Sequence, residues 1–227
     1  MTVYIDLGGI IMKKTFVLCL SVLMLSVSGA ALAADGDIKL PAPEKSGGSA
    51  LLDAVASRQS ARDFEDTELT SQQLSNLLWV TAGVNREDGK LTYATASNVQ
   101  DIIVYAFTRE GIYRYNPSDH SLTLIEKGDH RAATGRRQAF VAKAAVDLVY
   151  AQDTSRWKGD RPASVIENCG FEHIGAATQN AYLYAASQGW GARTRMSFDH
   201  AELAQLMKLT GTQDAKLMQC VGPKPRS

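Results

Sequence analysis

The sequence predicts an α+β protein. Two segments, 71–82 and 174–187, carry apolar residues in helical patterns, and three short strand-like runs follow one another between residues 101 and 126. The turn sequences between these runs are too short to hold a crossover helix, so the runs predict an antiparallel meander. Because helices and strands do not alternate as regular βαβ units, the pattern favours α+β over a doubly wound parallel sheet.

Length and charge narrow the class further. The 227 residues give room for one good hydrophobic core and a small appendage. The hydrophobic content of 45% is that of an ordinary globular protein, so the composition indicates neither disorder nor a repeat array. The formal net charge of +0 gives no support to nucleic-acid binding.

The first 33 residues have the pattern of a signal peptide. Lys13 and Lys14 precede an apolar run over 15–27, and Ala31-Leu32-Ala33 supplies a small-residue cleavage site. We expect cleavage after Ala33, with Met12 as an alternative start. The apolar run is too short for a membrane-spanning helix, and no stable membrane insertion is expected after the signal peptide is removed. The sequence therefore predicts a periplasmic or secreted protein.

Local signals then assign the elements in order. Residues 34–48 contain prolines and a Gly-Gly pair and predict a linker or an arm lying on the surface, after which Ser49 caps a short helix ending at residue 57. Thr70 to Gln73 forms a capping box ahead of a helix over 71–82, which Gly83 closes. Strands are expected at 101–108, 112–115, 122–126, 145–151, 192–196 and 216–221.

The remaining helices follow from similar signals. Helical character returns over 131–143, and Pro162 opens the next helix at its first position. The segment 174–187 is apolar around nearly its whole circumference, which predicts a central, buried helix ended by Gly189. Asp199, three residues before Glu202, caps a final short helix.

The candidate binding segment is Arg58-Gln59-Ser60-Ala61-Arg62. If the backbone is extended there, Arg58, Ser60 and Arg62 share one face. Two guanidinium groups on either side of a hydroxyl suit a phosphate monoester. The same residues also fit a solvated loop, and the segment alone does not decide between the two.

The order of several such motifs resembles the FMN-dependent nitroreductase family, specifically an exported branch related to the thiazoline/oxazoline dehydrogenases. The resemblance covers about residues 51–225. It rests on the Arg58–Arg62 segment followed by these motifs: Leu77-Leu78-Trp79, Gly83-Val84-Asn85-Arg86, the segment from Ala94 to Gln100, Gly111 to Tyr115, Gly128-Asp129-His130-Arg131, Gly175 with Gln179-Asn180, Gly189-Trp190-Gly191 and Val221-Gly222-Pro223.

The resemblance implies a mixed, mainly antiparallel sheet sandwiched by helices, in an intertwined homodimer that binds FMN at the subunit interface. Residues 49–227 would be the FMN-binding domain. It implies that the FMN phosphate and ribityl chain contact Arg58, Gln59, Ser60 and Arg62, with Lys224 near the phosphate. Asn98 and Gln100, two apart on an extended segment, would face the isoalloxazine, with Thr95 supplying a hydroxyl and Gly189-Trp190-Gly191 forming the turn beside the ring.

The expected activity follows from this cofactor. Such an enzyme passes two electrons from a reduced donor, NAD(P)H or another, through flavin N5 to a small organic acceptor of nitroaromatic or quinone type. No catalytic side chain is expected, because the flavin carries the chemistry. The alternatives are a non-catalytic flavin-binding or electron-carrier module and a scaffold that has lost FMN. Neither Gly-x-Ser-x-Gly nor Gly-x-Gly-x-x-Gly occurs.

Other reactive residues predict little chemistry. Cys169 and His173 stand four apart on a helix, but no third ligand is evident, so no metal is expected and a packing role is favoured for His173. Cys169 and Cys220 could form a disulfide or be two buried small residues, and both alternatives stay open. The sequence predicts that His120, His130, His200 and the arginines of 131–137 are solvated.

Overall fold

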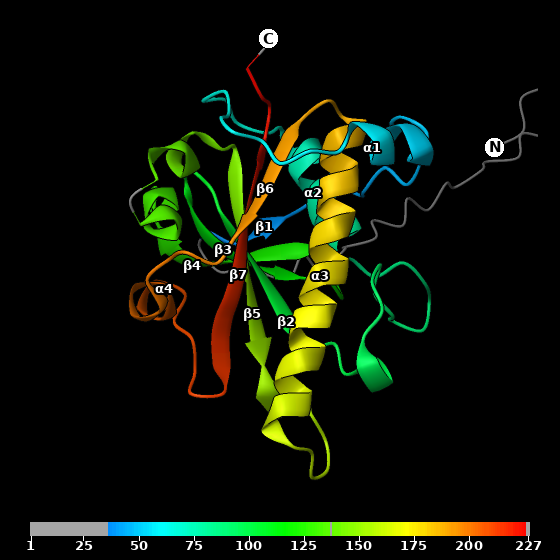
Figure 1. The fold of residues 1–227 in the computed structure, drawn as a ribbon, viewed down its shortest axis with the longest axis vertical. Coiled ribbons are helices and arrows are strands. Elements are labelled where there is room, and N and C mark those ends of the chain that lie inside the picture. Colours follow the sequence, from blue (N-terminus) through cyan, green and yellow to red (C-terminus); the bar gives the residue numbers. More distant parts are fainter. Residues whose placement is uncertain (1–35, 137, 226–227) are drawn as a thin grey trace, which may run out of the picture. The chain divides into compact units, whose positions relative to one another are not determined.

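The computed structural model describes residues 36–136 and 138–225. Its centre is a seven-stranded sheet in the order β1-β4-β3-β2-β5-β7-β6 (Figure 1). Every pair of neighbouring strands is antiparallel, which agrees with the predicted meander and class. The strands are β1 (Ile38–Lys39), β2 (Ile102–Phe107), β3 (Gly111–Asn116), β4 (Ser121–Lys127), β5 (Val146–Asp153), β6 (Gly191–Arg195) and β7 (Gln213–Gly222).

Helices cover both faces of the sheet. The α-helices are α1 (Leu51–Ser57), α2 (Ser71–Ala82), α3 (Ala163–Ser187) and α4 (His200–Leu206), and the 3-10 helices are η1 (Ala96–Asn98), η2 (Arg131–Gly135), η3 (Ala139–Lys143) and η4 (Thr154–Arg156). On one face α2 and α3 pack against side chains such as Leu148 and Tyr150. Residues of η3 and α4 pack against the alternate side chains, such as Val149, on the other face.

The helix α3 is the longest element and lies over the sheet (Figure 1). Its buried residues include Ile174, Ala177, Ala181 and Ala185, which recur every three or four positions and so form one face. Alanines at these positions let the helix lie close to the strands. The predicted central helix is confirmed, and it begins earlier than residue 174, at Ala163, with Pro162 as its N-cap.

Local capping chemistry was predicted with mixed success. The capping box at Thr70 is present, with Thr70 Oγ1 accepting from Gln73 N at 3.2 Å and Gln73 Oε1 accepting from Thr70 N at 2.8 Å. Asp199 accepts hydrogen bonds from Ala201 N and Glu202 N, as predicted for α4. Ser49 does not cap α1, whose N-cap is Ala50 without a side-chain hydrogen bond.

The segment 131–143 is not the single helix that its sequence predicts. It forms η2 and η3, separated at Arg136, whose φ of 49° lies in the left-handed region. A residue in that conformation cannot continue a right-handed helix. The apolar residues of the segment, such as Val141, still pack in the core, so the helical expectation was wrong in the type and the continuity of the helix.

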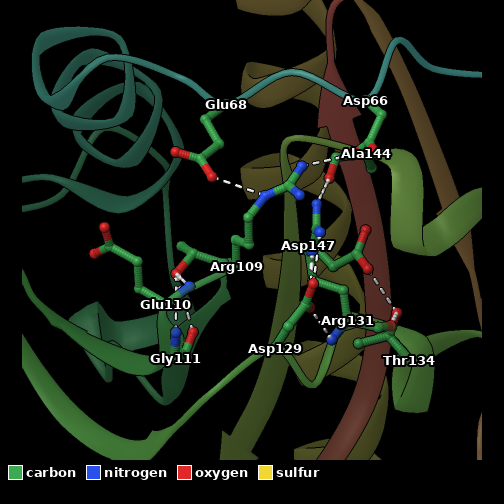
Figure 2. A network of polar contacts seen from close by, with 11 residues as sticks. Asp66, Glu68, Arg109, Glu110, Gly111, Asp129, Arg131, Thr134, Ala144 and Asp147 are labelled. Atoms are coloured by element: carbon green, nitrogen blue, oxygen red, sulfur yellow. Dashed lines mark hydrogen bonds and ion pairs between the residues drawn. The ribbon is translucent and has the colours of Figure 1, made fainter.

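Arg131 is also not solvated as predicted. Its side chain is 2% exposed, and the guanidinium donates from Nε and Nη2 to the two carboxylate oxygens of Asp129, at 2.9 and 2.7 Å. Nη1 donates to the carbonyl of Ala144 at 2.7 Å (Figure 2). Thr134 continues the network by donating to Asp147 at 2.7 Å. Arg131 thus ties η2 to the start of β5, and Arg137 lies outside the described residues.

The segment expected as a linker or arm lies along α2 and the edge of the sheet. Ile38 and Lys39 form β1 against β4, and Leu40 is buried. Ser75 of α2 donates to the Pro41 carbonyl at 2.6 Å, and its hydroxyl also lies 2.7 Å from His120 Nε2. His120 is therefore held in a hydrogen-bonded contact, not solvated as predicted, and burial lowers its pKa.

The predicted signal peptide over residues 1–33, including the alternative start at Met12, lies outside the described residues. Among residues 36–136 and 138–225, no helix is long and apolar enough to cross a membrane.

Candidate functional site

The candidate binding segment lies beside the edge strand β6. Ser60 forms a parallel bridge with Ala192, and Ala61 N donates to the Ala192 carbonyl at 2.9 Å. Arg58 ends α1 with extended dihedrals, φ −60° and ψ 122°. The extended backbone expected for this segment is therefore present where it meets the sheet, and β6 fixes its position.

Tyr182 on α3 organises this segment, and the sequence reasoning missed it. Its hydroxyl accepts a hydrogen bond from Thr194 N at 2.8 Å and lies 3.4 Å from Ser60 Oγ. The guanidinium of Arg58 stacks over its ring at 5.4 Å from the centroid. A usable signal was its place on the apolar helix, because a buried tyrosine hydroxyl needs a polar partner.

A pocket of about 450 Å³ opens at this point, within the size range of sites for small ligands and cofactors. It brings together most of the first group of predicted residues: Gln59, Ser60, Arg62, Gly189, Trp190, Gly191 and Lys224 line it, together with Tyr182. Arg58 is not among the lining residues and lies instead against the Tyr182 ring.

The charge at the pocket is positive and unneutralised. Within the described part of the chain, neither Arg62 nor Lys224 has an ion-pair or hydrogen-bond partner, although both line the pocket. Asp63, the one acidic residue in the lining, accepts from Lys143 at 3.4 Å. Free guanidinium and ammonium groups beside the Ser60 hydroxyl suit a phosphate group.

The glycine-rich turn forms another wall of the pocket. Gly189 has φ +71°, which favours glycine, and a Cβ at Gly191 would stand 2.6 Å from the Ala61 Cβ. Glycine at 191 therefore permits the close approach of β6 to the binding segment. Trp190, between these two glycines, packs edge-on against Tyr184, with the ring centroids 5.8 Å apart. This contact holds the Trp190 side chain against α3.

The second group of predicted residues lies in a different place. Thr95, Asn98 and Gln100 belong to a compact turn around η1, not to an extended segment. Gln100 Nε2 donates to Asn98 Oδ1 at 3.1 Å and Gln100 N donates to Thr95 Oγ1 at 3.2 Å. The expected extended segment is therefore wrong. The side chains of Asn98 and Gln100 are nevertheless adjacent, because they are hydrogen-bonded to each other within the turn.

In a single chain the two groups do not meet. The turn is bonded to His173, whereas the pocket is lined by Tyr182 and Ala186 farther along α3. At 1.5 Å per residue, the 9 steps from His173 to Tyr182 and the 13 steps to Ala186 correspond to about 14 and 20 Å along the helix axis. Gln100 instead lines a separate pocket of about 640 Å³ with Arg114 and Arg156.

The other reactive residues do not form a site. No group of three or more potential metal-ligating side chains occurs within residues 36–136 and 138–225. Both ring nitrogens of His173 are engaged, with Ala96 N at 2.8 Å and Asp101 Oδ1 at 2.6 Å. Cys169 and Cys220 are free, so the disulfide alternative is not realised. His200 is exposed, as the sequence predicts, and lies 3.6 Å from Asp214.

Together, the antiparallel sheet, the long helix α3 and a cationic pocket beside a glycine-rich turn define an α+β protein with a candidate site for a small anionic ligand. The sequence model of the nitroreductase family matches residues 55–223. The chain belongs to the nitroreductase family and is an oxidoreductase of that family.

Two relatives support this assignment. A Methanocaldococcus jannaschii protein that is named a nitroreductase is 31% identical over 175 residues, which cover 70% of this chain and 84% of the relative. A crystal structure of a Ralstonia eutropha protein, also named as a nitroreductase, has a TM-score of 0.78 and 36% identity. The match covers 84% of this chain and 90% of the Ralstonia chain.

More distant structures share the fold alone. The Escherichia coli microcin synthetase complex includes a chain with a TM-score of 0.65 and 16% identity, over 94% of this chain and 85% of its own. The Vibrio harveyi NADPH:FMN oxidoreductase, complexed with NAD+, has a TM-score of 0.58 and 17% identity, over 78% of this chain and 69% of its own.

Proposed function

We propose that the chain is an FMN-dependent oxidoreductase that moves two electrons from a reduced donor to a small organic acceptor of nitroaromatic or quinone type. The observation that carries this proposal is the pocket beside β6, where Arg62 and Lys224 have no partner among the described residues. A phosphate monoester with a flat ring fits such a pocket, because its anionic end needs fixed cations and its ring needs an open slot. FMN also appears in the name of the Vibrio harveyi structure that shares the fold.

We further propose that the working unit is a homodimer. The turn that carries Thr95, Asn98 and Gln100 is about 14 to 20 Å along α3 from the pocket that Arg62 lines, which favours a flavin site that takes the two groups from different chains. A second copy can supply the turn to the pocket of the first. The exposed apolar residues Leu51 and Leu52 on α1, next to the binding segment, support an interface on this side.

Each residue then has a distinct task. Ser60, Arg62 and Lys224 hold the phosphate, while Arg58 is oriented by Tyr182 at the base of this group. Asn98 and Gln100 of the partner subunit offer amide groups to the pyrimidine edge of the ring, which fixes its orientation. Trp190 limits the width of the slot. FMN, when bound, supplies the hydride chemistry, and the side chains supply position and charge.

The sequence and the proposed site also bear on the electron donor. A nicotinamide donor would bind over the flavin face, since the chain has no Gly-x-Gly-x-x-Gly fingerprint of its own dinucleotide site. The signal peptide predicted over residues 1–33 supports a periplasmic or secreted enzyme, which would draw on a donor present in that compartment.

The first test is the absorbance spectrum of the protein purified from Ala34 onward. We expect a yellow protein that releases FMN on denaturation, bleaches with NADPH and recovers its colour with a nitroaromatic acceptor. Flavin that never bleaches would favour an electron carrier or a flavin-binding module. A colourless protein that takes up no added FMN would refute the proposal.

The dimer is tested by complementation. Arg62→Ala and Asn98→Ala are expected to weaken FMN binding in each homodimer. In a heterodimer of the two variants, one site carries both substitutions and the other carries none, so one flavin per dimer should bind with the wild-type affinity. If both residues serve the same site within one chain, both sites of the heterodimer stay defective, and this outcome would contradict the shared site.

A further inference from the structure

The turn that carries Asn98 and Gln100 has a strained backbone. Ser97, Asn98 and Gln100 have φ of 51°, 54° and 49°, in the left-handed region that residues with side chains seldom adopt. Each such residue costs about 1 kcal/mol or more, so three within four positions persist only where the surroundings hold them. The surroundings that hold this turn are therefore part of whatever the turn does.

His173 of α3 holds the start of the turn. Its Nε2 accepts a hydrogen bond from the backbone N–H of Ala96 at 2.8 Å, and its Nδ1 lies 2.6 Å from Asp101 Oδ1. Because a backbone amide can only donate, Nε2 carries no proton and the proton is on Nδ1, which donates to Asp101. The ring is 1% exposed and Asp101 is 0% exposed, so water does not compete for either bond.

Asp101 holds the end of the turn and is itself fixed. It follows Gln100 directly, and its second oxygen, Oδ2, accepts from Gln152 Nε2 at 2.8 Å and Trp157 Nε1 at 2.9 Å. The Trp157 ring also stacks on the His173 ring, with centroids 6.4 Å apart and planes 9° apart. These contacts leave the imidazole one orientation, in which Nε2 faces Ala96 N.

We infer that His173 is a positioning residue: through its bond to Ala96, and backed by Asp101, it holds Asn98 and Gln100 in the conformation that meets the flavin ring. This inference rests on the proposed function, because it takes the turn as the ring-binding element. It assigns the pair a role at the ring end of the cofactor, distinct from the phosphate end that Arg62 serves.

The experiment compares His173→Phe, which keeps a ring but removes the acceptor, with His173→Gln, which keeps an acceptor at similar reach. Glu172→Gln, an exposed neighbour on α3, is the matched control. The first readout is hydrogen exchange of the Ala96 amide in the flavin-free protein. We expect exchange to be about tenfold faster in His173→Phe, partly restored in His173→Gln and unchanged in the control.

The second readout separates the two ends of the cofactor by measuring the Kd of FMN and of riboflavin, which has the ring without the phosphate. His173→Phe should weaken both ligands by a similar factor of about ten. Arg62→Ala should weaken FMN and leave riboflavin unchanged. Unchanged Kd values for both ligands in His173→Phe would overturn the inference, as would unchanged exchange at Ala96.

The outcomes also separate this inference from the proposed function. If the wild-type protein binds neither flavin, the proposed function fails and the ring-positioning role fails with it, whereas the exchange measurement still reports whether His173 holds Ala96. If the wild type binds FMN and His173→Phe gives the same Kd values and exchange rate as the Glu172→Gln control, the positioning role fails and the proposed function stands. Should His173→Phe not fold, Asp101→Asn gives a second comparison. An amide has one acceptor oxygen where the carboxylate has two, so either His173 Nδ1–H or the donors of Gln152 and Trp157 lose their acceptor.

Discussion

The guanidinium of Arg58 lies over the ring of Tyr182, with its central carbon 5.4 Å from the ring centroid, although 124 positions of sequence separate the two residues. The hydroxyl of the same tyrosine accepts from Thr194 N on β6. One side chain of α3 therefore fixes both the binding segment and the edge strand that supports it. The position of the candidate phosphate site depends on Tyr182 as much as on the cations themselves.

The first prediction concerns this hydroxyl. Tyr182→Phe keeps the ring under Arg58 but leaves Thr194 N without its acceptor. We expect a loss of about 1–2 kcal/mol in the free energy of unfolding, because an unpaired amide loses the bond and stays desolvated. Urea denaturation measures the loss. Tyr113→Phe is the control, since its hydroxyl makes no hydrogen bond among the described residues, and its effect should stay within about 0.5 kcal/mol.

The second prediction concerns the free cations. Arg62→Ala and Lys224→Ala should each weaken FMN binding by at least about tenfold, since a hydrogen bond to a charged group contributes roughly 1.5–3 kcal/mol. Fluorescence titration of FMN measures the change. Lys208→Ala removes a cation that pairs with Glu126 at 3.1 Å, away from the pocket, and should leave the Kd unchanged. Equal weakening in all three variants would indicate a nonspecific charge effect and contradict the assignment.

The third prediction concerns the approach of β6 to the binding segment. Gly191→Ala places a Cβ 2.6 Å from the Ala61 Cβ, closer than two carbons can approach. We expect about 1–3 kcal/mol of destabilisation and weaker FMN binding, because the segment must move away from the strand. Adding Ala61→Gly to the same chain removes the clash, so the double variant should recover part of both losses. Purely additive effects would show that the two positions do not touch in solution.

Local signals predicted the parts of the fold that local chemistry decides. The capping box at Thr70 and the cap at Asp199 depend on side chains within three positions, and both are present. The helix expected over 131–143 was wrong because Arg136 adopts a left-handed φ, which the apolar pattern of the segment does not report. The strand β1 was missed because two residues make it a strand only by pairing with β4, more than 80 positions away.

The predictions for the candidate site also succeeded where the signal was local and failed where it was not. The resemblance identified several of the residues that line the pocket, such as Gln59, Gly191 and Lys224, because each belongs to a short continuous motif in the sequence. It could not give the shape of the turn at Asn98, which depends on His173, 77 positions from Ala96. Nor did it indicate Tyr182, whose role follows from where α3 meets β6.

The last prediction concerns Asp147, which accepts a hydrogen bond from Thr134 in the network of Figure 2. Burial raises the pKa of this carboxyl from 3.8 to about 7, although Thr134 donates a hydrogen bond to it. A carboxyl whose pKa is higher in the folded state favours folding most at low pH. That contribution is complete below about pH 4 and is lost as the pH rises to about 7, a change on the order of 4 kcal/mol at most.

Asp147→Asn removes this titration while keeping an oxygen that can accept from Thr134. The stability of the variant relative to the wild type should therefore rise between pH 4 and pH 7 and stay level above that. The difference between the two proteins is the quantity to measure, since His120, whose pKa is lowered, changes stability in the opposite direction over part of the same range. The exposed Asp160→Asn serves as the control. A difference that does not vary with pH would mean that Asp147 stays ionised in the folded protein, held by the nearby guanidinium groups of Arg131 and Arg195.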